Sequence, residues 1–124
     1  MKQILVVEDH EDFRSIVNVL LSVIDPAAQI WNAVNGREGV DLAKQYHPDL
    51  ILLDMQMPIM DGYETAMALR QEVQTRDIPL VIMTSARDAG PTLVQLSAVC
   101  QGMLTKPFSL DELTAVIQSL KMPA

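Results

Sequence analysis

The sequence predicts an α/β domain in which a doubly wound parallel sheet of five strands has helices on both faces. Short apolar runs alternate along the chain with segments whose apolar residues recur every three or four positions. The apolar runs lack polar alternation, which is typical of strands covered on both faces. Strand–helix–strand crossovers are right-handed, so successive units build one parallel sheet. Because 124 residues suit one hydrophobic core, we expect residues 1–124 to form a single domain.

The strands are expected at five apolar runs. The third run is the most apolar and is expected at the centre of the sheet, whereas the second and the last are weaker or shorter. In chain order the runs are Ile4–Val7, Gln29–Ala33, Leu50–Leu53, Pro79–Met83 and Met103–Thr105.

The first two helices are predicted from apolar spacing and from residues that start or stop a helix. The first apolar stripe, which needs a sheet to cover, consists of Phe13, Ile16, Val17, Leu20 and Ile24. Pro26 ends this helix, because proline lacks an amide hydrogen and clashes with the preceding turn. Asn35, with Glu38 three residues later, is expected to cap the second helix, which runs to about Tyr46. Pro48 ends that helix by disfavouring helical backbone at the residue before it.

The last three helices have start signals of the same kind. Asp61 and Ser109 each have a glutamate three residues later, which is the pattern of a capping box. Pro91 suits the first turn of the fourth helix, which we expect to end before Gly102. The last helix carries an apolar face made of Leu110, Leu113, Val116, Ile117 and Leu120.

Composition and charge exclude several classes of protein. The chain has 16 acidic and 9 basic residues and no basic run, so we do not expect it to bind nucleic acid directly. No apolar run approaches the roughly 20 residues that cross a bilayer, and the N-terminus does not resemble a secretory signal. We therefore expect a cytoplasmic protein without membrane insertion. Cys100, the single cysteine, excludes an internal disulfide, and His10 and His47 are expected to be surface residues without a ligand.

Polar residues follow four of the expected strands at their carboxyl ends. These ends lie at one edge of a parallel sheet, where such folds place their ligand. The residues are Glu8, Asp9, Asp54, Thr84, Ser85 and Lys106. Three carboxylates at one edge repel one another unless a cation compensates, and Mg²⁺ prefers such oxygen ligands. Because Lys106 and Thr84 suit an anion, these residues together predict a site for a divalent metal and a phosphoryl group.

Four stretches of the chain also show a resemblance to a known family. They are Val6–Asp9, Asp54–Gly62, Met83–Ala86 and Thr105–Phe108. With these motifs at these spacings, the chain resembles the response-regulator receiver domain of two-component signalling over essentially its whole length. The resemblance is greatest to the single-domain form found in chemotaxis responses. It implies a flavodoxin-like sheet with the strand order 2-1-3-4-5.

The resemblance implies how the phosphoryl group is bound. Asp54 would accept it from the phosphohistidine of a sensor histidine kinase or a phosphotransfer protein. Lys106 and Thr84 would contact the phosphoryl oxygens, as would the backbone amides of Met55 and Ser85. The peptide bond that follows Lys106 would be cis and would position the lysine.

The same resemblance implies a magnesium ion. Asp9, Asp54 and the backbone carbonyl of Gln56 would hold Mg²⁺, with Glu8 assisting, often through water. The chain would be a phosphoacceptor rather than an enzyme, with an intrinsic ability to become phosphorylated and to lose the phosphoryl group to water. Gln56 and Ala86 flank the expected path of that water, and neither is ionisable. We therefore expect hydrolysis without a side-chain acid or base.

Two departures from the family pattern concern the conformational switch. Met103 stands where most receivers have Tyr or Phe, so a ring cannot report the position of Thr84. We expect switching mainly in the loop after Thr84 and in the fourth helix, with a weaker change at Met103. Val99 and Cys100 replace a common Gly–Ala pair, so the exit turn of the fourth helix is expected nearer Gly102. A downstream protein, or a second phosphorylated copy, would bind the face of the fourth helix, fifth strand and last helix.

Three other classes share the architecture or the chemistry. A flavodoxin-type domain needs a Ser-, Thr- or Gly-rich phosphate loop after the first strand, where this chain has the acidic segment 8–12. A haloacid-dehalogenase-type phosphatase needs a general acid two residues after its nucleophile, where Gln56 stands. A receiver that binds its partner without phosphorylation stays open as an alternative. The cognate kinase, the downstream target and whether the chain stands alone or is an excised domain also stay open.

Overall fold

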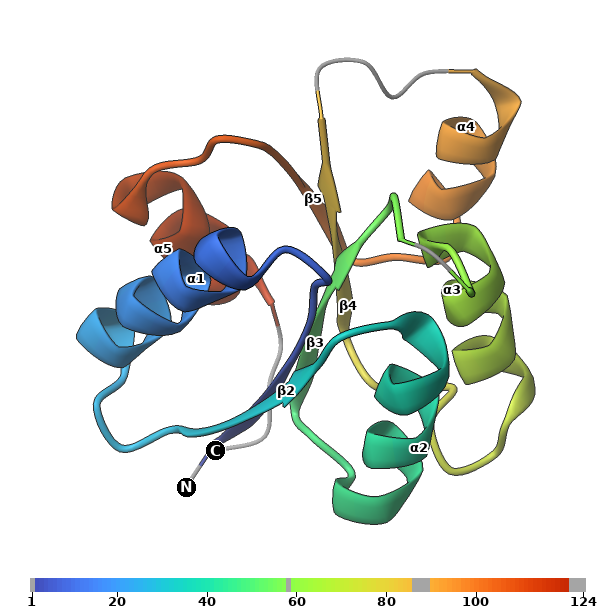
Figure 1. The fold of residues 1–124 in the computed structure, drawn as a ribbon, viewed down its shortest axis with the longest axis horizontal. Helices are drawn as coiled ribbons and strands as arrows, with labels where there is room; N and C mark the ends of the chain where they lie inside the picture. The colour runs from blue at the N-terminus through green and yellow to red at the C-terminus, as the bar shows by residue number, and fades with distance from the viewer. Residues whose placement is uncertain (1, 58, 86–89, 121–124) are drawn as a thin grey trace.

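The computed structural model describes residues 2–57, 59–85 and 90–120. They form a five-stranded parallel sheet in the order β2-β1-β3-β4-β5, so the predicted fold class and strand order are confirmed (Figure 1). From β1 the chain adds β2 on one side and then β3 on the other. This reversal places a topological switch point between β1 and β3.

Strands and helices alternate along the described chain. The strands are β1 (Gln3–Val7), β2 (Gln29–Ala33), β3 (Leu50–Asp54), β4 (Leu80–Thr84) and β5 (Gly102–Thr105). The helices are α1 (Glu11–Ile24), α2 (Gly36–Tyr46), α3 (Gly62–Gln71), α4 (Pro91–Ser97) and α5 (Leu110–Ser119). None of the described helices is long and apolar enough to cross a membrane.

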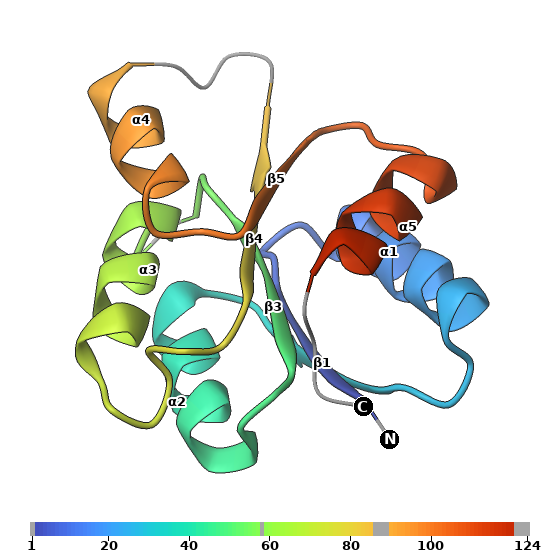
Figure 2. The same ribbon diagram turned by 180° about the vertical axis from the view of Figure 1, so that it is seen from behind.

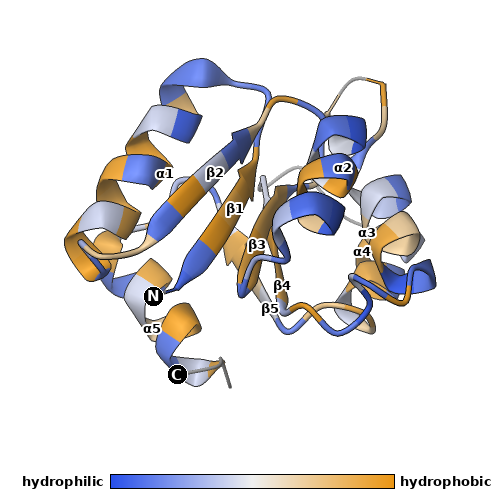
Figure 3. Ribbon diagram, turned by 90° about the horizontal axis from the view of Figure 1, so that it is seen from below, coloured by the Kyte–Doolittle hydropathy of each residue, from blue (hydrophilic) through white to orange (hydrophobic). Residues whose placement is uncertain are grey.

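The sheet is the middle of three layers. Helices α1 and α5 cover one face, and α2, α3 and α4 cover the other (Figures 1 and 2). Because side chains alternate along a strand, β1 contributes Leu5 and Val7 to the core beneath α2, α3 and α4, and Ile4 and Val6 to the core beneath α1 and α5. All of β3 is buried, as expected for the central strand. Apolar residues accordingly concentrate in the strands, between the two helical layers (Figure 3).

The predicted helix starts are confirmed by their hydrogen bonds. Asn35 Oδ1 accepts a hydrogen bond from the amide of Glu38 at 2.9 Å. Asp61 and Ser109 each form a complete capping box with the glutamate three residues later. α2 ends where predicted, at Tyr46, and the next residue, His47, adopts a left-handed conformation with φ 49° before the proline. The chain therefore leaves α2 through a left-handed cap rather than through an extended residue.

The predicted buried stripe of α1 is wrong at Ile16. Ile16 is 55% exposed, whereas Val17 and Leu21 are fully buried. Successive residues of a helix point about 100° apart, so Ile16 and Val17 cannot both face the sheet. The spacing of apolar residues did not show which of them lie at the centre of the buried face of α1. Packing against β1 and α5 places Val17 and Leu21 there.

The fourth helix ends before Gly102, as predicted, but its exit turn directly follows Ser97 and is not near that glycine. α4 ends at Ser97, and the chain reaches β5 through two hydrogen bonds to the carbonyl of Leu96, from the amides of Val99 at 3.0 Å and Cys100 at 3.1 Å. Among the described residues, none between 97 and 102 has a positive φ. The exit therefore needs no glycine at the Val99–Cys100 position.

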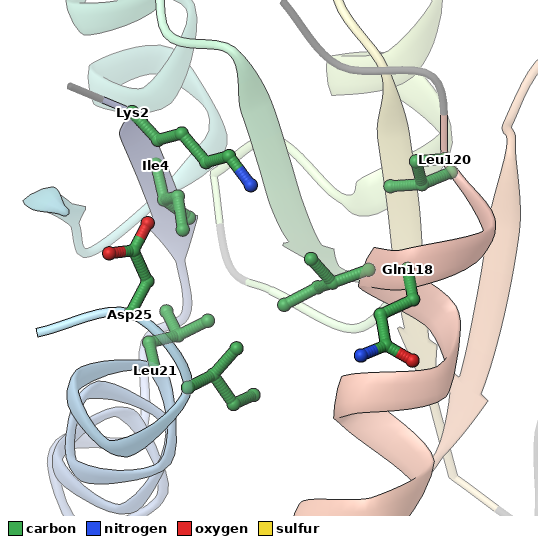
Figure 4. Close-up of a pocket in the computed structure, with 8 residues that line it drawn as sticks. Lys2, Ile4, Leu21, Asp25, Gln118 and Leu120 are labelled. Carbon is green, nitrogen blue, oxygen red and sulfur yellow. The ribbon is translucent and has the colours of Figure 1, made fainter. Parts of the chain in front are cut away.

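A cavity of about 320 Å³ lies between α1 and α5 (Figure 4). Its walls include Ile4, Leu21 and Leu120, with Lys2 and Asp25 nearby. These residues lie toward the amino ends of the strands. The cavity is therefore at the opposite end of the sheet from the polar residues that follow the strands.

Candidate functional site

The parallel ladder brings the predicted polar residues to one edge of the sheet. Asp54 is the last residue of β3 and Thr84 the last of β4, while Glu8 directly follows β1 and Lys106 directly follows β5. The register pairs Val7 with Leu53, Asp54 with Met83 and Thr84 with Thr105, so the four strands end nearly level. Three of the four side chains are buried, because the ends of the central strands lie between the helical layers.

Lys106 joins the two buried carboxylates. Its Nζ donates to Glu8 Oε1 at 2.7 Å and to Asp54 Oδ1 at 2.8 Å. The ammonium group also lies 4.7 Å from the centre of the Phe13 ring, whose edge-to-face partner is Phe108. The Phe13 ring, from the first turn of α1, therefore covers the ammonium group and limits its contact with water. The bond between Lys106 and Pro107 is cis, as the resemblance implies.

Burial and charge act in opposite directions on this ion pair. Burial raises the pKa of Asp54 to about 6; the hydrogen bond from Lys106 opposes this rise, and the charge of Glu8 adds to it. Burial lowers the pKa of Lys106, but hydrogen bonds to Asp54 and Glu8 outweigh it and leave that pKa above its ordinary value. The carboxylates therefore exceed the positive charge available to them within the site, which favours binding of a further cation.

Asp9 shows where a cation would bind. Its Oδ1 atom is buried and has no hydrogen-bond partner within the described chain. A carboxylate oxygen without a partner is costly unless an ion or a ligand compensates it. Ligand atoms of Glu8, Asp9, His10 and Asp54 all lie within 4.8 Å of one another. The donor set, mostly carboxylates, fits a hard divalent cation such as Mg²⁺.

The structure brings His10 close to the acidic pair, a position that the sequence interpretation did not anticipate. His10 was expected to be a surface residue without a ligand, and its side chain is indeed 75% exposed. The structure nevertheless places its Nδ1 atom 3.4 Å from Asp9 Oδ1 and 3.6 Å from Glu8 Oε2. Its position directly after the acidic pair was the available signal. His47, which follows α2 at the opposite end of the sheet, is not part of any such cluster of ligand atoms within the described residues.

The loop after β3 is held close to Asp54. A side chain at Gly62 would meet the backbone of Asp54 and Met55 at 2.6–2.7 Å, and the Gly62 amide donates to the Met55 carbonyl at 2.9 Å. The amide of Met55 donates to Met83 at 3.0 Å, so a phosphoryl contact from this amide would have to share or break that bond. Gln56 is exposed and Ser85 half-buried, while Pro58 and Ala86 lie outside the described residues.

The two predicted switch residues lie on neighbouring strands. Thr84 is buried, and its hydroxyl is 3.5 Å from the carbonyl of Leu104, a long contact. Met103 is half-buried and packs against the core beneath α2, α3 and α4. A hydroxyl held so weakly can turn toward another acceptor at little cost.

Comparisons with known proteins show which family this chain is similar to. A family model described as the response regulator receiver domain matches residues 4–118. A probable transcriptional regulator, ycf27, of Porphyridium aerugineum is 34% identical over 119 residues, which are 96% of this chain and 48% of that protein. The chain spans about half the length of the curated relatives it matches.

Two solved structures illustrate the likeness. Chemotaxis protein CheY4 of Vibrio cholerae is 28% identical with a TM-score of 0.86, over 98% of this chain and 99% of that one. The receiver domain of the sensor histidine kinase PA1611 of Pseudomonas aeruginosa is 26% identical with a TM-score of 0.85, over 94% of each chain. The latter structure has a magnesium ion coordinated in its active site cleft.

The chain therefore belongs to the response-regulator receiver-domain family. It is homologous to the phosphoacceptor domains of two-component systems, and none of these matches supports the alternative of a receiver that acts without phosphorylation. Receiver domains bind Mg²⁺ in an acidic pocket and interact with histidine kinases or phosphotransfer proteins.

Proposed function

We propose that Asp54 is the phosphoacceptor of this chain and that the phosphoryl group comes from a phosphohistidine of a histidine kinase or a phosphotransfer protein. The observation that carries the proposal is the contact of Lys106 with Asp54 at 2.8 Å, beside the Asp9 oxygen that has no hydrogen-bond partner in the described part of the chain. A positive donor for phosphoryl oxygens and an uncompensated ligand for a cation thus flank one buried carboxylate.

The transfer itself needs positioning rather than a strong nucleophile. A carboxylate oxygen of Asp54 forms the new bond to phosphorus while the bond from phosphorus to the imidazole nitrogen of the donor breaks, and the imidazole leaves with the electron pair. Charge spreads over the three remaining phosphoryl oxygens in the transition state. Lys106 and Thr84 are proposed to donate to those oxygens; the 2.8 Å contact of Lys106 with Asp54 and the position of Thr84 at the end of the neighbouring strand support this role. The amides of Met55 and Ser85 are proposed as further donors.

The metal ligands in this proposal are Glu8, Asp9, Asp54 and the backbone carbonyl of Gln56. When bound, Mg²⁺ neutralises charge on the carboxylates and on the phosphoryl oxygens. Glu8 is already hydrogen-bonded to Lys106 through Oε1, which favours an assisting role for it. Hydrolysis of the acyl phosphate would proceed without a side-chain acid or base from Gln56, an amide that cannot titrate.

The output of the signal is proposed to be a change in protein binding. Phosphorylation would draw the Thr84 hydroxyl from its long contact with Leu104 and rearrange α4 and the loop after Thr84, most of which lies outside the described residues, with a smaller change at Met103. A downstream protein, or a second copy of the chain, would recognise the surface formed by α4, β5 and α5. The relative from Porphyridium is named a probable transcriptional regulator, so an effector domain in a longer protein is a further candidate partner. The predicted cytoplasmic location remains part of this proposal.

Intact-mass measurement tests the phosphoacceptor directly. The wild-type chain, incubated with a small phosphodonor and Mg²⁺, should gain the mass of one phosphoryl group, and chelation of the metal should prevent the gain. The Asp54→Asn variant should gain nothing. Asp41→Asn, which changes an exposed aspartate of α2, should behave as the wild type. An equal adduct on Asp54→Asn, or none on the wild type, would show that Asp54 is not the acceptor.

A further inference from the structure

We infer that His10 is an additional metal ligand at this site and that it biases the site toward borderline transition-metal ions, with Ni²⁺ as the representative probe. The inference rests on the proposed function, because it concerns the cation that the same carboxylates would hold. The proposed site differs from the magnesium site implied by the family because His10, in the loop between β1 and α1, adds a nitrogen ligand.

The side chain of His10 is not engaged in starting α1. His10 is the N-cap residue, with extended backbone at φ −78° and ψ 111°, but it makes no side-chain capping hydrogen bond. Its backbone amide instead donates to Glu8 Oε2 at 3.2 Å. This bond closes the short loop between β1 and α1 and holds the imidazole beside the acidic pair.

The imidazole approaches oxygens other than those that Lys106 contacts. His10 Nδ1 lies 3.6 Å from Glu8 Oε2, whereas Lys106 donates to Oε1 of the same carboxylate. His10 Nδ1 also lies 3.4 Å from Asp9 Oδ1, the buried oxygen without a hydrogen-bond partner within the described chain. Lys106 therefore contacts one oxygen of the Glu8 carboxylate, and His10 lies near the other oxygen and near Asp9 Oδ1.

These spacings suit ligands that share one ion. In an octahedral site with metal–ligand distances of about 2.1 Å, adjacent ligand atoms are about 3 Å apart and opposite ones about 4 Å apart. The two distances from His10 Nδ1, 3.4 and 3.6 Å, are near the adjacent value. Ligand atoms of Glu8, Asp9, His10 and Asp54 span at most 4.8 Å, so small side-chain movements suffice to bring them around one cation.

The combination of nitrogen and oxygen ligands decides which cations bind more tightly when His10 takes part. Mg²⁺ prefers oxygen ligands and retains water, so an imidazole adds little to its binding. Ions from Fe²⁺ to Zn²⁺ bind imidazole well, and their affinity for a mixed nitrogen and oxygen site rises along the series toward Ni²⁺ and Cu²⁺. His10 should therefore raise the affinity for Ni²⁺ relative to Mg²⁺ beyond what the carboxylates alone provide.

The test compares two matched substitutions, His10→Asn and His47→Asn, in the full tag-free chain freed of metal by chelation. Asparagine is a good N-cap at position 10 and tolerates the left-handed backbone at position 47, so both variants should fold. Calorimetric titrations with Ni²⁺ and Mg²⁺ give the ratio of the two affinities. In His10→Asn this ratio should fall about tenfold or more, and in His47→Asn it should stay at the wild-type value.

A second readout locates the nitrogen. Adding Zn²⁺ to the wild-type chain should shift the imidazole ¹⁵N resonance of His10 Nδ1, whereas Mg²⁺ should leave it in place. An unchanged affinity ratio in His10→Asn, or a Zn²⁺ shift confined to His47, would overturn the role of His10 while leaving the magnesium site intact. Failure of both Mg²⁺ and Ni²⁺ to bind the wild type would instead contradict the proposed metal site as a whole.

Discussion

At the scale of single residues, the site is defined by one buried carboxylate, Asp54, whose negative charge is only partly balanced by the positive charge of Lys106. Asp54 is 3% exposed and is hydrogen-bonded to Lys106, yet its pKa is raised to about 6 because burial outweighs the positive partner. An ionised Asp54 therefore destabilises the metal-free folded chain. The same imbalance prepares the carboxylate for a cation and a phosphoryl group.

Asp54→Asn should stabilise the metal-free chain at neutral pH. The pKa of Asp54 in the folded chain is about 6, above the ordinary value of 3.8. The buried charge of Asp54 therefore costs no stability below pH 3.8, and its full cost is present above about pH 6. In urea denaturation with a chelator, the variant should gain about 1–3 kcal/mol near neutral pH and almost nothing near pH 4. Asp41→Asn serves as the exposed control. A variant less stable than the wild type at neutral pH would mean that the pairing with Lys106 outweighs burial.

At the scale of elements, Arg70 links the end of α3 to the loops on either side of β4. Its guanidinium donates to the carbonyls of Arg76 at 3.0 Å, Ile78 at 2.9 Å and Val99 at 3.0 Å. It also donates at 2.9 Å to the side chain of Gln101, which in turn accepts from the amide of Leu80 at 2.7 Å. These bonds hold the exit of α4, where the chain lacks the common glycine.

Arg70→Ala should be strongly destabilising. The substitution leaves several partly buried carbonyls without their charged donor, which costs about 2–4 kcal/mol. Urea denaturation should show this loss, while Arg37→Ala, at an exposed position of α2, should change stability by less than about 0.5 kcal/mol. Equal stability of the two variants would show that water replaces the guanidinium without cost.

Gly39 lets α2 approach β1 closely. A Cβ at this position would lie 2.8 Å from Cγ2 of Val7. Gly39→Ala should therefore cost about 1–3 kcal/mol, although alanine is favoured over glycine in an exposed helix by about 1 kcal/mol. The same substitution in a Val7→Ala background should cost less, because the clash is removed. Thermal or urea denaturation of the double-mutant cycle measures this coupling. If the effects of Gly39→Ala and Val7→Ala on stability simply add, the close approach of position 39 to Val7 is contradicted.

At the scale of the whole molecule, the site sits where the topology reverses and where four strands end together. Its cation would join Glu8 and Asp9, in the loop that leads from β1 into α1, with Asp54 at the end of β3. Binding there should stabilise the entire fold, because the unfolded chain has no preformed site. Part of the formal net charge of −7 is thus concentrated at one edge of the sheet, in Glu8, Asp9 and Asp54.

Addition of Mg²⁺ should raise the free energy of unfolding of the wild type. At a concentration ten times the dissociation constant, the gain should be about 1.4 kcal/mol. Asp9→Ala should abolish most of this gain, because the substitution removes a buried oxygen that no described residue satisfies with a hydrogen bond. Denaturation at constant ionic strength, with and without Mg²⁺, measures the difference. An equal gain in both proteins would indicate nonspecific screening rather than a site at Asp9.

The sequence by itself determined the alternation of strands and helices, the helix caps and the strand-end positions of Asp54, Thr84 and Lys106. These are local properties, since apolar periodicity, capping pairs and prolines act within a few residues. Only the tertiary structure decided which stripe of α1 is buried, so that Ile16 points outward, and that α4 stops at Ser97. It also decided the contacts of Lys106 and the place of His10 beside Asp9, because those depend on how separate segments pack across the sheet edge.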